Sequence, residues 1–137
     1  MQLEDGEKAV RFARSIIESY VKQEALPNED LGGVFRDKQG VFVTIHTYPS
    51  HMLRGCIGIP EPIMPLQDAL KEAAISATHD PRFPPLSEKE LDNIIIEVTI
   101  LTPPKLLKVS HPREYPSKIK VGRDGLIVRK GGYSGLL

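Results

Sequence analysis

Prolines limit the regular structure that this chain can form more than any other residue type. Proline lacks a backbone N–H and fixes its own φ angle, so it is disfavoured inside helices and in central strands. Pro27 ends a helical pattern, Pro60 ends a strand pattern, and Pro103 with Pro104 ends another. The prolines thus predict a series of short elements, and a chain of 137 residues predicts one domain over residues 1–137.

Apolar residues at helical spacing predict two main helices. Residues 5–26 repeat apolar side chains three and four positions apart, and acidic residues crowd the start of the segment, where they complement the helix dipole. Residues 66–77 carry a continuous apolar stripe whose many alanines would allow close approach to a sheet. Ser87 followed by Glu90 is a capping-box pattern and predicts a short helix through about residue 92.

Runs of β-branched residues predict the strands. A polar turn ending in Gly40 predicts a hairpin between residues 34–35 and 41–48, and residues 53–59 extend it into an antiparallel meander. Residues 94–101 predict a central strand buried on both faces, which makes Glu97 a costly buried carboxylate. Residues 118–121 and 126–129 flank a turn with two glycines and predict a second hairpin. The expected fold is α+β, a mixed, mainly antiparallel sheet packed by two main helices, with a C-terminal hairpin.

The segment at residues 53–59, LRGCIGI, is the predicted functional surface. Side chains alternate along a strand, so the odd-numbered residues, including Gly55, form one face that can anchor in a core. The even-numbered residues Arg54, Cys56 and Gly58 form the other face. That face combines a cation, the only thiol of the chain and a bare backbone position.

Cys56 has two interpretations. A reactive thiol needs a nearby cation such as Arg54, access to solvent and normally a base, for which His46, His51 and His79 are the candidates. The alternative is a small buried hydrophobe, a common fate of free cysteine. Cys56 is the one catalytic candidate in the chain, and a binding role for the surface around it is favoured over covalent catalysis.

Asp80 and Arg82 lie in a connector that three prolines stiffen. Such rigidity would hold a charged pair in fixed geometry for carboxylate or phosphate recognition. The alternative is an ion pair that only locks the loop. Glu97 is expected to face Arg54 or Arg82 across the sheet as a counter-ion, a role favoured over that of a general base.

A basic, glycine-containing turn near the end of the chain is a third candidate, because consecutive backbone N–H groups can bind an anion. Its candidate residues are Arg123, Arg129, Lys130 and Tyr133. Ordinary turn usage is the alternative. The chain holds neither a GxxxxGK nor a GxGxxG motif, and its histidines and cysteine match no standard metal spacing, so no cofactor and no metal are expected.

Charge is unevenly distributed along a chain whose net charge is zero. Residues 1–104 hold ten Lys and Arg against sixteen Asp and Glu, whereas residues 105–137 hold eight against two. The basic segment predicts either an anionic partner or packing against the acidic remainder. A single cysteine, an acidic start and the absence of a long apolar run predict a cytoplasmic protein without membrane contact.

Four segments follow one another in the order LRGCIG, PLQDALKEAAISATHDPRFPPLSEKELD, IEVTILTPP and VGRDGLIVRKGGYSGLL, within a match that runs from about residue 33 onwards. Together they resemble the AMMECR family, named for the AMME chromosomal deletion syndrome. The resemblance implies a compact α+β domain with a functional glycine-flanked cysteine motif, and a pathway shared with a Memo-like and a radical-SAM protein. Family members usually continue for several tens of residues past GGYSGLL, so the chain is expected to lack the usual C-terminal extension.

Two functional hypotheses follow. The first is an enzyme, or an accessory to one, that binds or processes a small anionic substrate in a cleft lined by Arg54, Cys56, Arg82 and the basic turn. The second is a non-catalytic adaptor or RNA-binding module that uses residues 105–137. The chain has no Trp, four Tyr and four Phe, which leaves few aromatic rings for base stacking, so nucleic acid is the less favoured partner.

Overall fold

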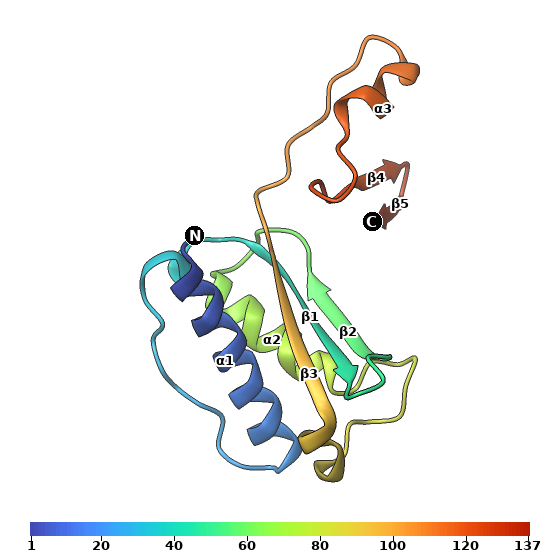
Figure 1. Ribbon diagram of the computed structural model, residues 1–137. Helices are drawn as coiled ribbons and strands as arrows, with labels where there is room; N and C mark the ends of the chain where they lie inside the picture. Colours follow the sequence, from blue (N-terminus) through green and yellow to red (C-terminus); the bar gives the residue numbers. More distant parts are fainter. The chain divides into compact units, whose positions relative to one another are not determined.

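The computed structural model describes residues 1–137, which form two compact units, Met1–Pro103 and Pro104–Leu137. The first unit contains a three-stranded sheet of β1 (Gly40–Thr47), β2 (Leu53–Ile59) and β3 (Ile94–Leu101). The strand order is β2-β1-β3, and both pairings are antiparallel (Figure 1). The predicted α+β class with a mainly antiparallel sheet is confirmed.

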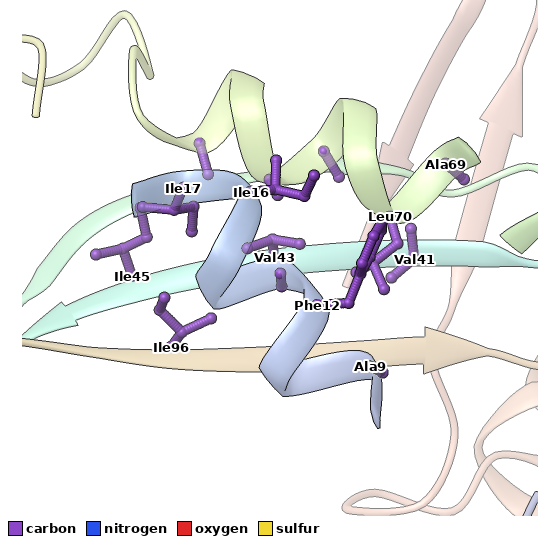
Figure 2. Close-up of a cluster of buried hydrophobic side chains, with 14 of the residues drawn as sticks. Ala9, Phe12, Ile16, Ile17, Val41, Val43, Ile45, Ala69, Leu70 and Ile96 are labelled. Atoms are coloured by element: carbon purple, nitrogen blue, oxygen red, sulfur yellow. The ribbon is translucent and has the colours of Figure 1, made fainter. Parts of the chain in front are cut away.

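Two helices, α1 (Leu3–Val21) and α2 (Leu66–Ala77), cover one face of this sheet (Figure 1). Four alanines of α2 are buried, so the helix backbone packs close to the strands, as the alanine-rich stripe predicts. Figure 2 shows Val43 and Ile45 of β1 meeting Ile16 and Ile17 of α1 in the core. Each fully buried aliphatic side chain of this kind contributes about 1.5–3 kcal/mol to folding.

The first helix ends at Val21, not at residue 26 as the pattern predicts. Gln23 adopts a left-handed conformation with φ +57°, and the N–H of Glu24 donates a hydrogen bond to the carbonyl of Ser19 at 2.8 Å. This is the geometry of a Schellman-type helix end. Local hydrogen bonding therefore ends the helix before Pro27 can.

The hairpin predicted between residues 34–35 and 41–48 is wrong. Gly32 and Gly33 have positive φ angles and turn the chain into a short 3-10 helix, Gly33–Arg36. The segment that follows pairs with the start of α2 instead, since the N–H of Leu66 donates to the carbonyl of Asp37 at 2.8 Å. Only glycine adopts such backbone angles readily, so the glycine pair specifies this turn.

β3 lies at an edge of the sheet, and the prediction of a central strand buried on both faces is wrong. Its residues alternate, with Ile94 and Ile96 buried and Ile95 and Glu97 exposed. Glu97 is therefore hydrated, and the expected cost of burying its charge does not arise. The capping box of Ser87 and Glu90 is confirmed and begins the 3-10 helix Glu88–Asn93.

The second unit contains the 3-10 helix Pro112–Glu114, the single-turn helix α3 (Tyr115–Lys118) and the antiparallel hairpin of β4 (Ile127–Lys130) and β5 (Tyr133–Leu136). A C-terminal hairpin is present, but its strands differ from the predicted pair. Asp124 accepts a hydrogen bond from the N–H of Lys120 at 2.9 Å. Residues 120–124 therefore form a turn of their own and do not connect two paired strands. The hairpin instead turns at Gly131, whose φ is +60°. No helix of either unit has the length and apolar character needed to cross a membrane.

Candidate functional site

β2 presents Cys56 on the face of the sheet opposite the helices. Cys56 pairs with Thr44 of β1, and Thr44 pairs with Glu97 of β3, so these three residues form one row across the strands. The thiol is half-buried and free, and its Sγ lies 3.2 Å from Oγ1 of Thr44, within hydrogen-bonding distance. The predicted split of this strand into two faces is confirmed from Gly55 onwards.

A β-bulge changes the pattern at the start of β2. His46 pairs with Leu53 and the preceding residue Ile45 pairs with Gly55, so Arg54 is the extra residue. A bulge shifts the side-chain alternation by one position. Leu53 is consequently 39% exposed and does not anchor in the core as the alternation predicts.

Gly55 lies where α2 approaches the strand most closely. A Cβ atom at this position would lie 2.3 Å from the carbonyl oxygen of Ala77. Backbone occupies that space, so no side chain fits. The absence of a side chain at Gly55 therefore lets the backbone of β2 pack directly against the end of α2.

Asp80 and Arg82 bind the backbone of Cys56 at the free edge of β2. Oδ2 of Asp80 accepts the N–H of Cys56 at 3.0 Å, and Nη2 of Arg82 donates to the carbonyl of Cys56 at 3.4 Å. The two side chains pair with each other through Nε to Oδ1 at 3.1 Å and Nη2 to Oδ2 at 2.7 Å. We call Asp80 and Arg82 the edge clamp, because together they satisfy backbone groups that a further strand would otherwise pair with.

The electrostatics of the edge clamp are asymmetric. The Asp80 side chain is 1% exposed and the Arg82 side chain 57% exposed. The hydrogen bonds from Arg82 hold the pKa of Asp80 well below its usual range, and the N–H groups of Cys56 and Arg82 act in the same direction. The hydrogen bonds to Asp80 raise the pKa of Arg82, with smaller contributions from the charges of Asp80 and Cys56.

Arg54 is not the cation that would activate the thiol, because its guanidinium is bound to Glu90. Nε of Arg54 donates to Oε1 of Glu90 at 2.8 Å and Nη2 donates to Oε2 at 3.1 Å. The Arg54 side chain is only 13% exposed, and the pair lowers the pKa of Glu90. The sequence pattern assigns Glu90 only to the capping box. Its second role, as the counter-ion of Arg54, could have been inferred from the sequence only from the need of a buried strand arginine for a carboxylate partner.

The remaining sheet candidates are placed differently from expectation. The side chain of Glu97 forms no hydrogen bond or ion pair, so it is not the counter-ion of Arg54 or of Arg82, which pair with Glu90 and Asp80. Gly58 is not bare, because a Cβ there would lie 2.3 Å from the ring of Phe42, which covers it from the neighbouring strand. Its backbone is thus closed to a ligand on that side.

None of the three histidines is hydrogen-bonded to the thiol. The rings of His46 and His51 stack on each other with centroids 4.2 Å apart and an interplanar angle of 14°. His79 is exposed and packs beside the ring of Tyr20. No three His, Cys, Asp or Glu side chains are grouped so that they could share a metal ion.

The basic candidates near the chain end lie in the second unit. Arg123 is bound to Asp124 through Nε to Oδ1 at 2.6 Å, and the pair lowers the pKa of Asp124 to about 2. Arg129 and Lys130 are exposed on β4, and Tyr133 is exposed on β5. The structure thus brings together Cys56, Asp80 and Arg82 in one cluster and places Arg54 with Glu90 beside it in the same unit.

Comparison with known proteins identifies one family. The family model described as AMMECR1 matches residues 10–137. Protein MJ0810 of Methanocaldococcus jannaschii is 59% identical over 138 residues, which cover 100% of this chain and 69% of that protein. Protein MK0488 of Methanopyrus kandleri is 52% identical over 144 residues, covering 100% of this chain and 68% of that protein.

A solved structure supports the fold. The crystal structure of Uncharacterized Protein PH0010 from Pyrococcus horikoshii matches with a TM-score of 0.89 and 53% sequence identity. The match covers 98% of this chain and 68% of that chain.

Proposed function

Because the chain belongs to the AMMECR1 family and its LRGCIG motif forms the strand that the edge clamp holds, we propose that it binds a small anionic molecule beside Cys56 and Arg82. One observation carries the proposal. Arg82 is held in place by a nearly buried carboxylate, yet more than half of its own side chain is exposed. A cation fixed in this way is preorganised for a ligand, because little side-chain freedom is lost on binding.

The guanidinium keeps hydrogen-bonding capacity for such a ligand. Arginine has five N–H donors, and the bonds of Arg82 to Asp80 and Cys56 use only Nε and Nη2. The two donors of Nη1 remain for a carboxylate or phosphate oxygen. Since Asp80 neutralises much of the charge of Arg82, recognition rests on these directed donors more than on net charge.

The surroundings of the thiol favour binding over nucleophilic chemistry. A catalytic cysteine normally has a base in hydrogen-bond contact. Cys56 has the hydroxyl of Thr44 in that place, and no histidine contacts its Sγ. We therefore assign Cys56 and Thr44 as polar neighbours of the bound anion. A Memo-like or radical-SAM protein, which the family resemblance implies, would be the partner that supplies or consumes this anion.

The reactivity of Cys56 tests the proposal, because it is the only thiol in the chain. We expect the folded protein to favour anionic iodoacetate over neutral iodoacetamide more than glutathione does under the same conditions. Arg82→Gln should return the rate ratio to that of glutathione. The matched control is Arg36→Gln, which removes another exposed arginine paired with an aspartate, Asp30.

Three outcomes would contradict the anion site. The first is a rate ratio no higher than that of glutathione. The second is an equal fall in the ratio for both arginine variants. The third is a folded protein in which neither reagent modifies Cys56, since the proposed ligand lies against this thiol.

A second candidate function is polyanion binding by the unit Pro104–Leu137, in line with an adaptor or RNA-binding role. It is favoured by the concentration of positive charge in one compact unit, with eight Lys and Arg against two Asp and Glu. Such binding would be electrostatic and would weaken with salt. Retention on an immobilised polyanion measures it.

A further inference from the structure

A groove of about 590 Å³ lies where α1 and α2 end, and no residue of the predicted anion site lines it. Both helices end at the same end of the sheet (Figure 1). The volume is within the range of small-molecule sites. Its walls come from the last turn of α1, the segment after it, the end of α2 and the proline connector: Tyr20, Val21, Gln23, Glu24, Leu26, Thr78, His79, Pro85 and Leu86.

Backbone carbonyls at the two helix ends contribute partial negative charge to the groove. The C-terminus of a helix carries about half a negative charge, and two such ends meet here. Neither α1 nor α2 has a basic residue in its last turn, and Lys22 at the cap of α1 is exposed and does not line the groove. The carboxylate of Glu24 forms no ion pair or side-chain hydrogen bond, so its charge adds to that of the helix ends.

The same groove has an aromatic and apolar lining. The rings of Tyr20 and His79 lie with centroids 5.9 Å apart and an interplanar angle of 33°. Leu86 is buried, and Val21 and Leu26 are partly buried against the core. The face of the Tyr20 ring attracts cations, and the apolar groups favour a ligand with a hydrocarbon part.

We propose that this groove binds a small organic cation with an apolar body, of the arylalkyl- or alkylammonium class. The ammonium group lies near Glu24, the two helix ends and the face of the Tyr20 ring, and the hydrocarbon part packs against Leu26 and Leu86. An anion of the same shape is repelled by the groove. This site is separate from the anion site at Cys56 and goes beyond the proposed function.

The test uses phenethylamine, which is an ammonium ion at neutral pH, with phenylethanol as the neutral analogue and phenylpropionate as the anion. Titration followed by NMR should give saturable shifts of the ring signals of Tyr20 and His79 with the amine. Glu24→Gln and Tyr20→Leu should each weaken amine binding about two- to fivefold, the size expected for one partly exposed charge or cation–π contact. The matched control for Glu24→Gln is Glu7→Gln, which removes an exposed carboxylate of α1 that lies outside the groove.

Each of three results would overturn the cation site: no saturable shift with the amine, equal affinity for amine and alcohol, or unchanged affinity in Glu24→Gln. Because the signals come from Tyr20 and His79, the result does not depend on Cys56 alkylation. Failure of one site therefore leaves the test of the other intact.

Discussion

At the scale of single residues, the edge clamp depends on the charge of Asp80. The residue is 2% exposed, and its carboxylate accepts four hydrogen bonds, from Cys56 and Arg82. Four donors leave it no unsatisfied oxygen, which is the condition under which a nearly buried charge is stabilising. One ionised group therefore binds the backbone of β2 at Cys56.

Asp80→Asn should lower the free energy of unfolding at pH 7 by about 1 to 2 kcal/mol, because charge-assisted hydrogen bonds are lost from a pair that is partly open to water. The pKa of Asp80 is depressed in the folded state, so the carboxylate stabilises the protein above the usual carboxyl pKa of about 3.9. This contribution is lost as the pH falls through the folded-state pKa. The difference between the two proteins should shrink below about pH 4, as measured by urea unfolding at pH 7, 5 and 3.

Asp30→Asn is the control for this prediction, because Asp30 also pairs with an arginine but is 62% exposed. It should destabilise the protein less than Asp80→Asn does. Equal losses for the two variants at pH 7, or a difference that does not shrink in acid, would show that the charge of Asp80 does not stabilise the edge of the sheet.

At the scale of elements, the position of the site depends on how closely β2 packs on α2. Gly55→Ala should destabilise the first unit by about 1–3 kcal/mol, since the new Cβ would lie 2.3 Å from the backbone oxygen of Ala77 and one element must move. Gly6→Ala in α1 is the matched control, because no atom lies within 4 Å of the place that its Cβ would occupy. Alanine is the better helix former, so Gly6→Ala should be neutral or stabilise by up to about 1 kcal/mol. Thermal unfolding that gives both variants the same sign would contradict the close contact.

Elements with a clear period could be predicted from the sequence, and those set by local backbone geometry could not. The apolar stripes of α1 and α2 and the alternation of β1 and β2 are repeated many times over, so their type is strongly specified. The end of α1 depends on one left-handed residue, Gln23, and the bulge at Arg54 depends on strand register. A single residue carries too little pattern to predict either feature.

The candidate site was predictable in its members and in the Asp80–Arg82 pair, but not in the surroundings of Arg54 and Glu97. Proline spacing and alternation led to Asp80, Arg82 and Cys56, which the structure brings together. Ion-pair partners, by contrast, are chosen by long-range packing. Arg54 therefore pairs with Glu90, 36 residues away, and the edge position of β3 leaves Glu97 in solvent.

At the scale of the whole molecule, a net charge of zero conceals two units of opposite sign. Counting Lys and Arg against Asp and Glu, the unit Met1–Pro103 has an excess of acidic residues and the unit Pro104–Leu137 an excess of basic ones. Exposed charges act over roughly 8 to 10 Å at moderate ionic strength. A polyanion therefore responds to the local excess of a unit rather than to the total charge of the chain.

Retention on heparin should accordingly depend on where a positive charge lies. The protein should bind at low salt and elute as salt rises, because bound counterions are released from the polyanion. Replacing three exposed lysines of the second unit by glutamine should lower the eluting salt concentration: Lys105, Lys120 and Lys130. The control makes the same change in net charge with three exposed lysines of the first unit and should leave elution nearly unchanged: Lys22, Lys38 and Lys89.

Passage of the protein through heparin at low salt would contradict polyanion binding by the unit Pro104–Leu137. Equal shifts for the two triple variants would show that only total charge matters, and the basic segment would then have no binding role of its own.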